Sequence, residues 1–351
     1  CEMCIRDRCW PDRLPSISLM RLRFPCLFPL FCSLLLAVAA RGDQPVPRTV
    51  TGLGLELVPI APGSFVMGCP DDEPGRSPNE GPQTRVTITR PFWLGKFEVT
   101  HGQWKAIMGT DLLEQARRLL ADQTRHSFRA GLLTIHERYG NPEDWRPIAL
   151  LGDTSDEVAM YWVNWEEADE FCRRLTARER AAGRLPDGYV YRLPTEAERE
   201  YACRAGTTGA HYAAGGQTID DIAWHSGNSG DGYAGPGWVT GQNGWAWSEQ
   251  GRAGPRRVGL KAPNAWGLYD LLGNVWEHCA DGYVTNLPGG TLVDPCWPET
   301  DHRHTAKGGG WNNRAGESRA SERTGTHPTY RIYNLGFRVA LAPALAASVA
   351  R

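Results

Sequence analysis

The sequence has no excess of charge of one sign and no long run of like charges. Its 38 Lys and Arg are balanced by 40 Asp and Glu, for a formal net charge of −2. Because nucleic-acid binders usually carry a basic patch or stripe, this balance argues against that class of protein. The chain also shows no internal repeat, no P-loop motif and no Ser-His-Asp arrangement, which argues against solenoids, P-loop nucleotide hydrolases and triad hydrolases.

Cysteines are few in the part of the chain that we expect to fold. Five of the ten (Cys1, Cys4, Cys9, Cys26 and Cys32) lie in residues 1–40. That segment is interpreted as an upstream extension followed by a signal peptide, since basic residues after Met20 precede an apolar run over 24–40 that ends in small residues. A membrane anchor is the alternative. We therefore expect a secreted or periplasmic protein without stable membrane insertion after signal cleavage.

The odd number of remaining cysteines limits the disulfides. They are Cys69, Cys172, Cys203, Cys279 and Cys296. In an exported chain, five cysteines allow at most two disulfides and one free thiol. Cys279 and Cys296 can form one such pair, and no zinc-type C-x2-C pair is present in this part of the chain.

Glycine, proline and tryptophan are abundant instead. The chain has 40 Gly, 25 Pro and 14 Trp, with 41% apolar and 22% charged residues. The apolar fraction is sufficient for a sizeable core and argues against global disorder. This composition predicts a compact, loop-rich fold that is anchored by large aromatic side chains.

Local patterns predict short strands and a few well-capped helices. Residues 55–67 read as two strands around a Pro62-Gly63 turn, residues 84–100 contain an alternating strand, and a closing strand follows Arg338. Capping boxes mark three helix starts. The pairs are Thr100 with Gln103, Asn164 with Glu167, and Thr195 with Glu198. The second of these helices would bury one apolar stripe: Ala168, Phe171, Cys172 and Leu175. We interpret Cys172 and Cys203 as core residues.

These patterns predict one α+β domain of low secondary-structure content. It covers residues 53–341 and carries a polar insertion over 109–156, with a helix in DLLEQARRLLADQ and mostly loop over 205–263. A linker over 41–52 precedes the domain and a tail over 342–351 follows it.

The densest chemical signal is NAWGLYDLLGNVWEHCAD, residues 264–281. Asp270 and Glu277 flank a tight turn at Gly273 and Asn274. Carboxylates around a turn with free backbone carbonyls suit a hard cation such as Ca2+. A solvated turn with an incidental acidic pair is the alternative that the residues alone leave open.

Several motifs together resemble the formylglycine-generating enzyme family, also called sulfatase-modifying factors. PGSFVMG, FEVTHGQW, YRLPTEAEREYACRAG, GLYDLLGNVWE, GGGWNN and NLGFRVA occur in that family's order over roughly residues 53–341. The resemblance implies a fold related to C-type lectins. It also implies a structural calcium site at Asp270, Gly273, Val275 and Glu277, and gives Glu80 a structural role.

The resemblance implies a different outcome for catalysis. Family enzymes oxidise a substrate cysteine with O2, using two cysteines that hold Cu(I). Those two positions here are Asn313 and Ser318. Because Cu(I) prefers soft sulfur ligands, we expect no copper and no standard oxidase chemistry.

Two functions remain after this loss. The first is a binding or accessory module that contacts a peptide or glycan through an exposed set: Trp311, Asn312, Asn313, Arg319 and Asn334. The second is a divergent oxidase, acting on a sulfatase cysteine or in pyoverdine maturation. His302 and His304 can bind Cu or Fe with a further ligand or form a polar strand face. Ser318 as a nucleophile would need an oriented base.

Overall fold

A computed structural model of the chain describes residues 46–128, 131–134, 137, 151–234, 238–239, 252–299 and 302–345. The expected signal segment and residues 346–351 of the tail lie outside these ranges. Residues Asp43–Arg351 form one compact unit, and helices and strands are mixed within it. The prediction of a single α+β domain is confirmed.

The strands form three larger sheets and two small hairpins. The five-stranded sheet has the order β1(Arg48–Val50), β2(Leu55–Ile60), β5(Phe92–Gly95), β16(Ala340–Pro343) and β8(Tyr189–Arg192), all antiparallel. The four-stranded sheet has the order β14(Arg323–Thr326), β13(His304–Lys307), β11(Trp276–Gly282) and β15(Leu335–Gly336). The others are β12(Thr291–Val293), β4(Thr84–Ile88) and β3(Gly63–Met67); β6(Arg125–Phe128) with β7(Gly131–Thr134); and β9(Trp238–Val239) with β10(Arg252–Ala253).

The helices begin where the capping boxes predict. The α-helices are α1(His101–Met108), α2(Leu112–Ala121), α4(Trp165–Ala181), α5(Glu196–Arg204) and α6(Ile219–Ile222), with 3-10 turns η1(Pro78–Glu80) and η3(Ala315–Glu317). The N-caps of α1, α4 and α5 are Thr100, Asn164 and Thr195, each in a reciprocal box. The helix expected in the insertion is α2, so these local predictions are confirmed.

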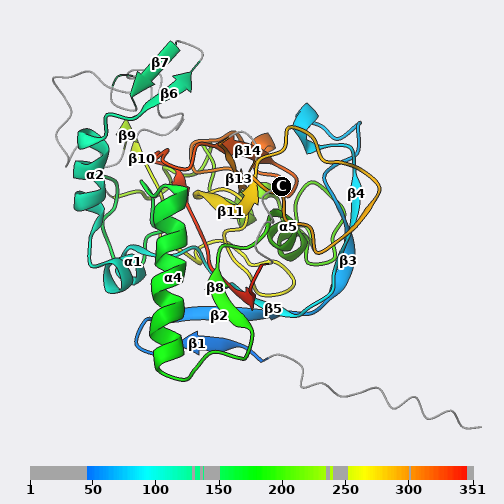
Figure 1. Cartoon of the computed structure of the whole chain (residues 1–351). Coiled ribbons are helices and arrows are strands. Elements are labelled where there is room, and N and C mark those ends of the chain that lie inside the picture. The colour runs from blue at the N-terminus through cyan, green and yellow to red at the C-terminus, as the bar shows by residue number, and fades with distance from the viewer. Residues whose placement is uncertain are drawn as a thin grey trace, which may run out of the picture. The chain divides into compact units, whose positions relative to one another are not determined.

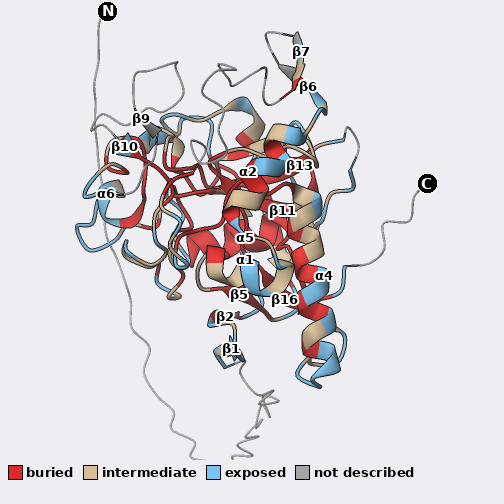
Figure 2. Ribbon diagram, turned by 90° about the vertical axis from the view of Figure 1, so that its left-hand side faces the viewer, coloured by how far each residue is buried: buried red, intermediate tan, exposed pale blue. Residues whose placement is uncertain are grey.

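The five-stranded sheet separates two apolar clusters. Because side chains alternate across a strand, Trp93 and Leu341 join the cluster under α1 and α4, while Leu94 and Ala340 join the cluster at α5. Figure 1 shows α4 on one side of this sheet and α5 in the interior, and Figure 2 shows that buried residues concentrate around α5 and β11. The predicted stripe on α4 is buried.

Two boundaries differ from the prediction. Strand β1 lies in the expected linker, where it pairs with β2 through Arg48↔Leu57 and Val50↔Leu55. Strand β16 continues to Pro343, past the expected end at residue 341. Strand β1 is at the edge of the sheet, whereas β16 lies between β5 and β8. Three or four residues carry too little periodicity to reveal a strand.

The possible disulfide does not form. Cys69, Cys172, Cys203, Cys279 and Cys296 are all free, and Cys279 is buried in β11 whereas Cys296 is exposed. Cys172 and Cys203 are buried in α4 and α5, as expected of core residues. Among the helices that the structure describes, none combines the length and apolar character needed to cross a membrane.

Candidate functional site: two faces of the four-stranded sheet

Residues of the four-stranded sheet alternate between a charged face and a pocket. The register pairs Glu277 with Lys307 and Lys307 with Arg323, so these three side chains lie on one face, toward α5. Their neighbours Trp276 and Thr324 fall on the other face. Because side chains alternate along each strand, the charged groups and the cavity lie on opposite sides of one sheet.

The face toward α5 holds a buried ionic network. Lys307 Nζ lies 2.9 Å from Glu200 and 3.5 Å from Glu196, and Arg323 Nε lies 2.6 Å from Glu196. All four side chains are fully buried. Burial by itself would raise the pKa of Glu196, but the charges of Arg323 and Lys307 outweigh it, so the pKa is lowered. This face is built for stability.

The predicted calcium turn lies at the edge of this network. Asp270 and Asn274 have positive φ angles of 51° and 56°, and Gly273 is required because a Cβ there would lie 2.1 Å from the Trp224 carbonyl oxygen. Asp270 Oδ2 accepts a hydrogen bond from the Gly259 N–H at 2.6 Å. Asp270 Oδ1 is buried and has no hydrogen-bond partner in the described structure.

The glutamate of the predicted set is fully engaged. Both Glu277 oxygens accept from Arg338 at 2.7 Å, and Oε2 also accepts from Arg199 at 3.2 Å. The buried Glu98 beside Asp270 also leaves Oε2 unpartnered, and burial together with the Asp270 charge raises the pKa of Glu98. Calcium prefers six to eight free oxygens. With Glu277 held by two guanidinium groups, the four predicted ligands do not fit the ion as they stand.

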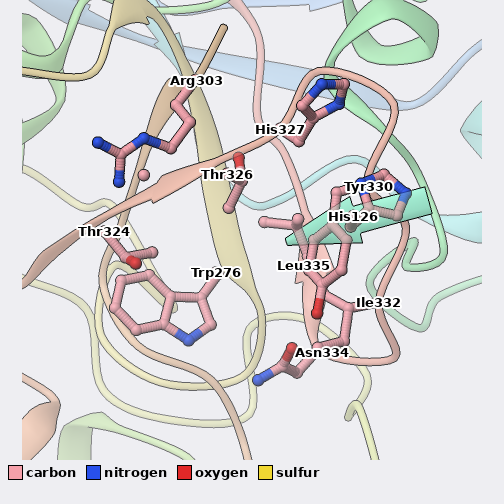
Figure 3. A pocket seen from close by; sticks show the side chains of 11 residues that line it. His126, Trp276, Arg303, Thr324, Thr326, His327, Tyr330, Ile332, Asn334 and Leu335 are labelled. Carbon is pink, nitrogen blue, oxygen red and sulfur yellow. The ribbon is translucent and has the colours of Figure 1, made fainter. Parts of the chain in front are cut away.

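The opposite face opens into a cavity of about 700 Å³. Its lining comes from β6, β11, β14, β15, the β14–β15 connection and the residue before β13: His126, Trp276, Arg303, Thr324, Gly325, Thr326, His327, Tyr330, Ile332, Asn334 and Leu335. In Figure 3 the Trp276 indole and the Asn334 amide lie at one end of this pocket, with Arg303 and His327 toward the other. No lining residue that the structure describes is Asp or Glu.

The insertion supplies one wall of the pocket. His126 from β6 packs edge-on against His327 and Tyr330, with ring centroids 5.2 and 5.4 Å apart. Burial and the neighbouring His327 lower the pKa of His126. Arg331 fixes this wall, because it pairs with Asp122 after α2 and with Glu167 in α4, at 3.0 and 2.9 Å. The insertion is therefore part of the site.

The predicted contact set is only partly at the pocket. Asn334 lines it, and its amide donates to Asn312 Oδ1 at 2.6 Å. Asn313 lies behind Trp276, whose indole N–H donates to Asn313 Oδ1 at 2.9 Å. The expectation of exposure is wrong for Trp311, which is fully buried, and for Arg319, which is buried in ion pairs. It is also wrong for Asn334, which is buried although it lines the pocket.

Arg319 belongs to a separate structural cluster. Its guanidinium binds Glu80, Glu73 and Glu322. Burial would raise the pKa of Glu80, but hydrogen bonds from Arg319 and Ser321 lower it. Cys69 contacts Glu80 at 3.5 Å, and burial raises the pKa of its thiol to about 11, so it stays protonated. This cluster ties the segment before β4 to the segment before β14.

The two positions that carry copper cysteines in the family do not fit copper here. Asn313 Oδ1 accepts from Trp276 Nε1 and from the Gly310 N–H, while Nδ2 donates to Glu317 at 3.0 Å. Ser318 is fully buried, and its Oγ has no hydrogen-bond partner in the described structure. An engaged amide and a buried hydroxyl are poor ligands for a soft ion. Without a base beside it, Ser318 is not an activated nucleophile either.

His302 lies before β13 and His304 is its first residue, and their side chains have different environments. His304 is buried and stacks on Trp165 with a centroid distance of 3.8 Å, whereas the His302 side chain is 86% exposed. Both contact Glu299, at 3.2 and 3.4 Å. They do not form one polar strand face, since only His302 is exposed. The interpretation of a Cu or Fe site stays a prediction.

Sequence reasoning missed most of the pocket. Trp276 stood inside the recognised motif, and its alternation with Glu277 was the available signal. His126 and Tyr330 lie far apart in the chain and in no motif, so no local pattern indicates that they meet.

The chain is similar in sequence and fold to known proteins. A sequence profile of the sulfatase-modifying factor enzyme 1-like domain matches residues 44–343. The formylglycine-generating enzyme of Bos taurus is 26% identical, over 85% of this chain and 76% of the bovine protein. The inactive C-alpha-formylglycine-generating enzyme 2 of Mus musculus is 28% identical, over 89% of this chain and 95% of that protein. PvdO from Pseudomonas aeruginosa superposes with a TM-score of 0.59 at 26% identity, over 84% of this chain and 97% of PvdO.

Proposed function

Since the chain belongs to the sulfatase-modifying factor family, we propose that it is an exported binding or accessory module that does not oxidise cysteine. Its ligand is an extended polypeptide segment with an acidic side chain, bound in the pocket that Trp276 and Asn334 line. Similarity to a mouse relative named as inactive supports the absence of oxidase activity.

One observation carries this proposal. Asn313, at a copper-ligand position of the family, has its amide locked by three hydrogen bonds, yet a cavity of about 700 Å³ opens next to it, beyond Trp276. The reactive ligands are replaced while the space for a substrate is kept. This combination suits recognition without the copper reaction.

The pocket chemistry indicates the ligand class. Strand β14 is an edge strand, and three consecutive residues of it, Thr324 to Thr326, line the pocket. Edge strands offer backbone groups to an added peptide strand, and the Trp276 and Tyr330 rings supply apolar contact area. Arg303 favours an acidic group over a basic one, since the described lining has no carboxylate, and His126 and His327 offer imidazole hydrogen-bonding groups.

The test is selection of random extended peptides on the purified chain, followed by titration of single peptides against Trp fluorescence. We expect acidic peptides to be enriched and basic permutations of the same composition to bind at least about tenfold more weakly, a difference of about 1.4 kcal/mol. Thr324→Trp, which fills the cavity, should abolish binding, and Arg173→Ala on the exposed face of α4 should leave it unchanged. Equal binding of acidic and basic peptides would refute the ligand class.

The divergent-oxidase alternative has its own readout. A peptide with the sulfatase motif Cys-x-Pro-x-Arg is incubated with the protein, copper and O2, and its mass is measured. We expect no aldehyde. Conversion of the cysteine to an aldehyde would reject the non-oxidising module, whatever the peptide selection returned.

A further inference from the structure

Two arginines converge on the carboxylate that was predicted to bind calcium. Arg338 donates to both oxygens of Glu277 at 2.7 Å, and Arg199 Nε donates to Oε2 at 3.2 Å. All three side chains are fully buried. Arg199 comes from α5 and Arg338 from the segment before β16, so the contact joins two distant parts of the chain to β11.

The same arginines also bind the backbone of the turn between Asp270 and Glu277. Arg199 Nη2 donates to the Leu271 carbonyl oxygen at 2.6 Å. Arg338 Nη2 donates to the carbonyl oxygens of Tyr269 and Asp270 at 2.9 and 3.2 Å. Carbonyl oxygens and a carboxylate are thus bridged by guanidinium groups, as a hard cation would bridge them.

The surrounding backbone is shaped around Arg199. Gly308, with a φ of 99°, passes so close that a Cβ would lie 2.5 Å from Arg199 Nη2 and 2.9 Å from the Leu271 oxygen. The glycine therefore admits the guanidinium to the turn. A side chain at residue 308 would displace either the arginine or the turn.

We infer that Arg199 and Arg338 hold the 270–277 turn in place of a calcium ion, and that the chain folds without a divalent metal at this turn. Guanidinium is permanently charged and offers several donors in a fixed plane, so it satisfies a carboxylate and a carbonyl together. A divalent ion on Glu277 would lie close to two positive charges in a medium that screens them poorly. This inference is independent of the proposed ligand.

Two carboxylate oxygens at the turn remain available to a metal ion. Asp270 Oδ1 and Glu98 Oε2 are buried without partners in the described structure. An ion that entered despite the arginines would use these oxygens. Binding there would show itself as metal retained by the wild-type chain and lost in Asp270→Asn.

The first experiment measures metal content and melting temperature of the purified chain after dialysis, with calcium and with a chelator. We expect less than about 0.1 calcium per chain and the same melting temperature in both conditions, within about 1 °C. One retained calcium per chain, with a melting temperature that falls on chelation, would overturn the inference.

The second experiment converts the turn to calcium dependence. Arg199→Gln removes one charge and frees the Leu271 oxygen, so its melting temperature should fall by roughly 5–10 °C without calcium and recover partly when calcium is added. Arg173→Gln, an exposed arginine, is the matched control and should show neither change. If Arg199→Gln does not fold, Arg199→Lys is measured instead. Calcium should raise the melting temperature of this variant, but not to that of the wild-type chain.

A contrary outcome is that both Arg199 variants lose stability without responding to calcium, while the stability of the wild type depends on calcium. The ion would then bind through Asp270, and Arg199 would be only a packing residue. The wild-type chelation result decides the inference even if both variants fail to fold.

Discussion

The two faces of the four-stranded sheet differ in how their polar groups are satisfied. On the face toward α5, Glu196, Lys307 and Arg323 are fully buried and each charge has a partner of opposite sign. On the pocket face, Trp276, Thr324 and Asn334 line the cavity, and the Trp276 and Asn334 side chains also hydrogen-bond to Asn313 and Asn312. A buried charge that loses its partner costs stability, whereas a pocket group that loses its side chain costs ligand binding. The same strands therefore carry the ionic network and the proposed recognition pocket, on adjacent residues that face opposite sides of the sheet.

The largest change in stability should follow from removing a charge from the buried ionic network. Lys307→Met leaves the carboxylates of Glu196 and Glu200 facing only their arginines, and we expect a loss of about 3–5 kcal/mol in the free energy of unfolding, measured in urea. Thr324→Val, one strand away on the other face, should cost less than about 1 kcal/mol. Equal losses in the two variants would mean that the faces do not divide in this way.

The pH dependence of stability should be next in size. Burial and the charge of Glu196 raise the pKa of Asp281 to about 8, so the native state keeps a proton that the unfolded state releases. The stability from this group is complete below pH of about 4 and is lost as pH rises through about 8. Burial would raise the pKa of Glu200, but the charges of Lys307 and Arg204 outweigh it, so the pKa is lowered. The stability from this group is present above pH of about 4.3 and is lost at lower pH.

We therefore expect the free energy of unfolding to be greatest near pH 5 and to fall by roughly 2–4 kcal/mol toward pH 8. Urea titrations across this range measure it. Asp281→Asn should flatten the alkaline side, and a wild-type curve that rises steadily from pH 5 to pH 8 would contradict the assignment.

A smaller effect, on binding alone, is expected at the pocket. Tyr330→Ala removes the ring that packs on His126. We expect affinity for an acidic peptide to fall roughly tenfold while stability changes by less than about 1.5 kcal/mol. Tyr330→Phe keeps the ring and is the control that should bind nearly as well. If Tyr330→Ala unfolds the chain instead, the residue belongs to the core rather than to the recognition face.

The smallest effect sets the baseline for both faces. Arg173 pairs with Asp169 and Glu170 on α4, and its side chain is 65% exposed. Because exposed ion pairs gain little in water, Arg173→Ala should change stability by less than about 0.5 kcal/mol and binding not at all. A larger loss would mean that surface charges cannot serve as neutral controls in this protein.

Predictions from local pattern succeeded where the interaction is local. The capping boxes at Thr100, Asn164 and Thr195 place α1, α4 and α5 because both partners lie within three residues. The two strands on either side of Pro62 were predicted from their own sequences, although they join different sheets. Strand β1 was missed, since its three residues are strand only through pairing with β2.

Prediction of the site failed where long-range contacts decide. Trp311 and Arg319 stand in a glycine-rich stretch that favours an exposed loop, yet both are buried, Arg319 by Glu80 from almost the other end of the domain. Glu277 has the right type and spacing for a calcium ligand, but Arg199 and Arg338 take its oxygens.

The sequence by itself determined the family and the capped helices, because each depends on residue identity and short spacing. Only the tertiary structure decided which oxygens remain free at Asp270 and Glu277, and which side chains meet His126 in the pocket. The physical reason is that burial and charge pairing depend on neighbours in space, and residues far apart in the chain supply those neighbours.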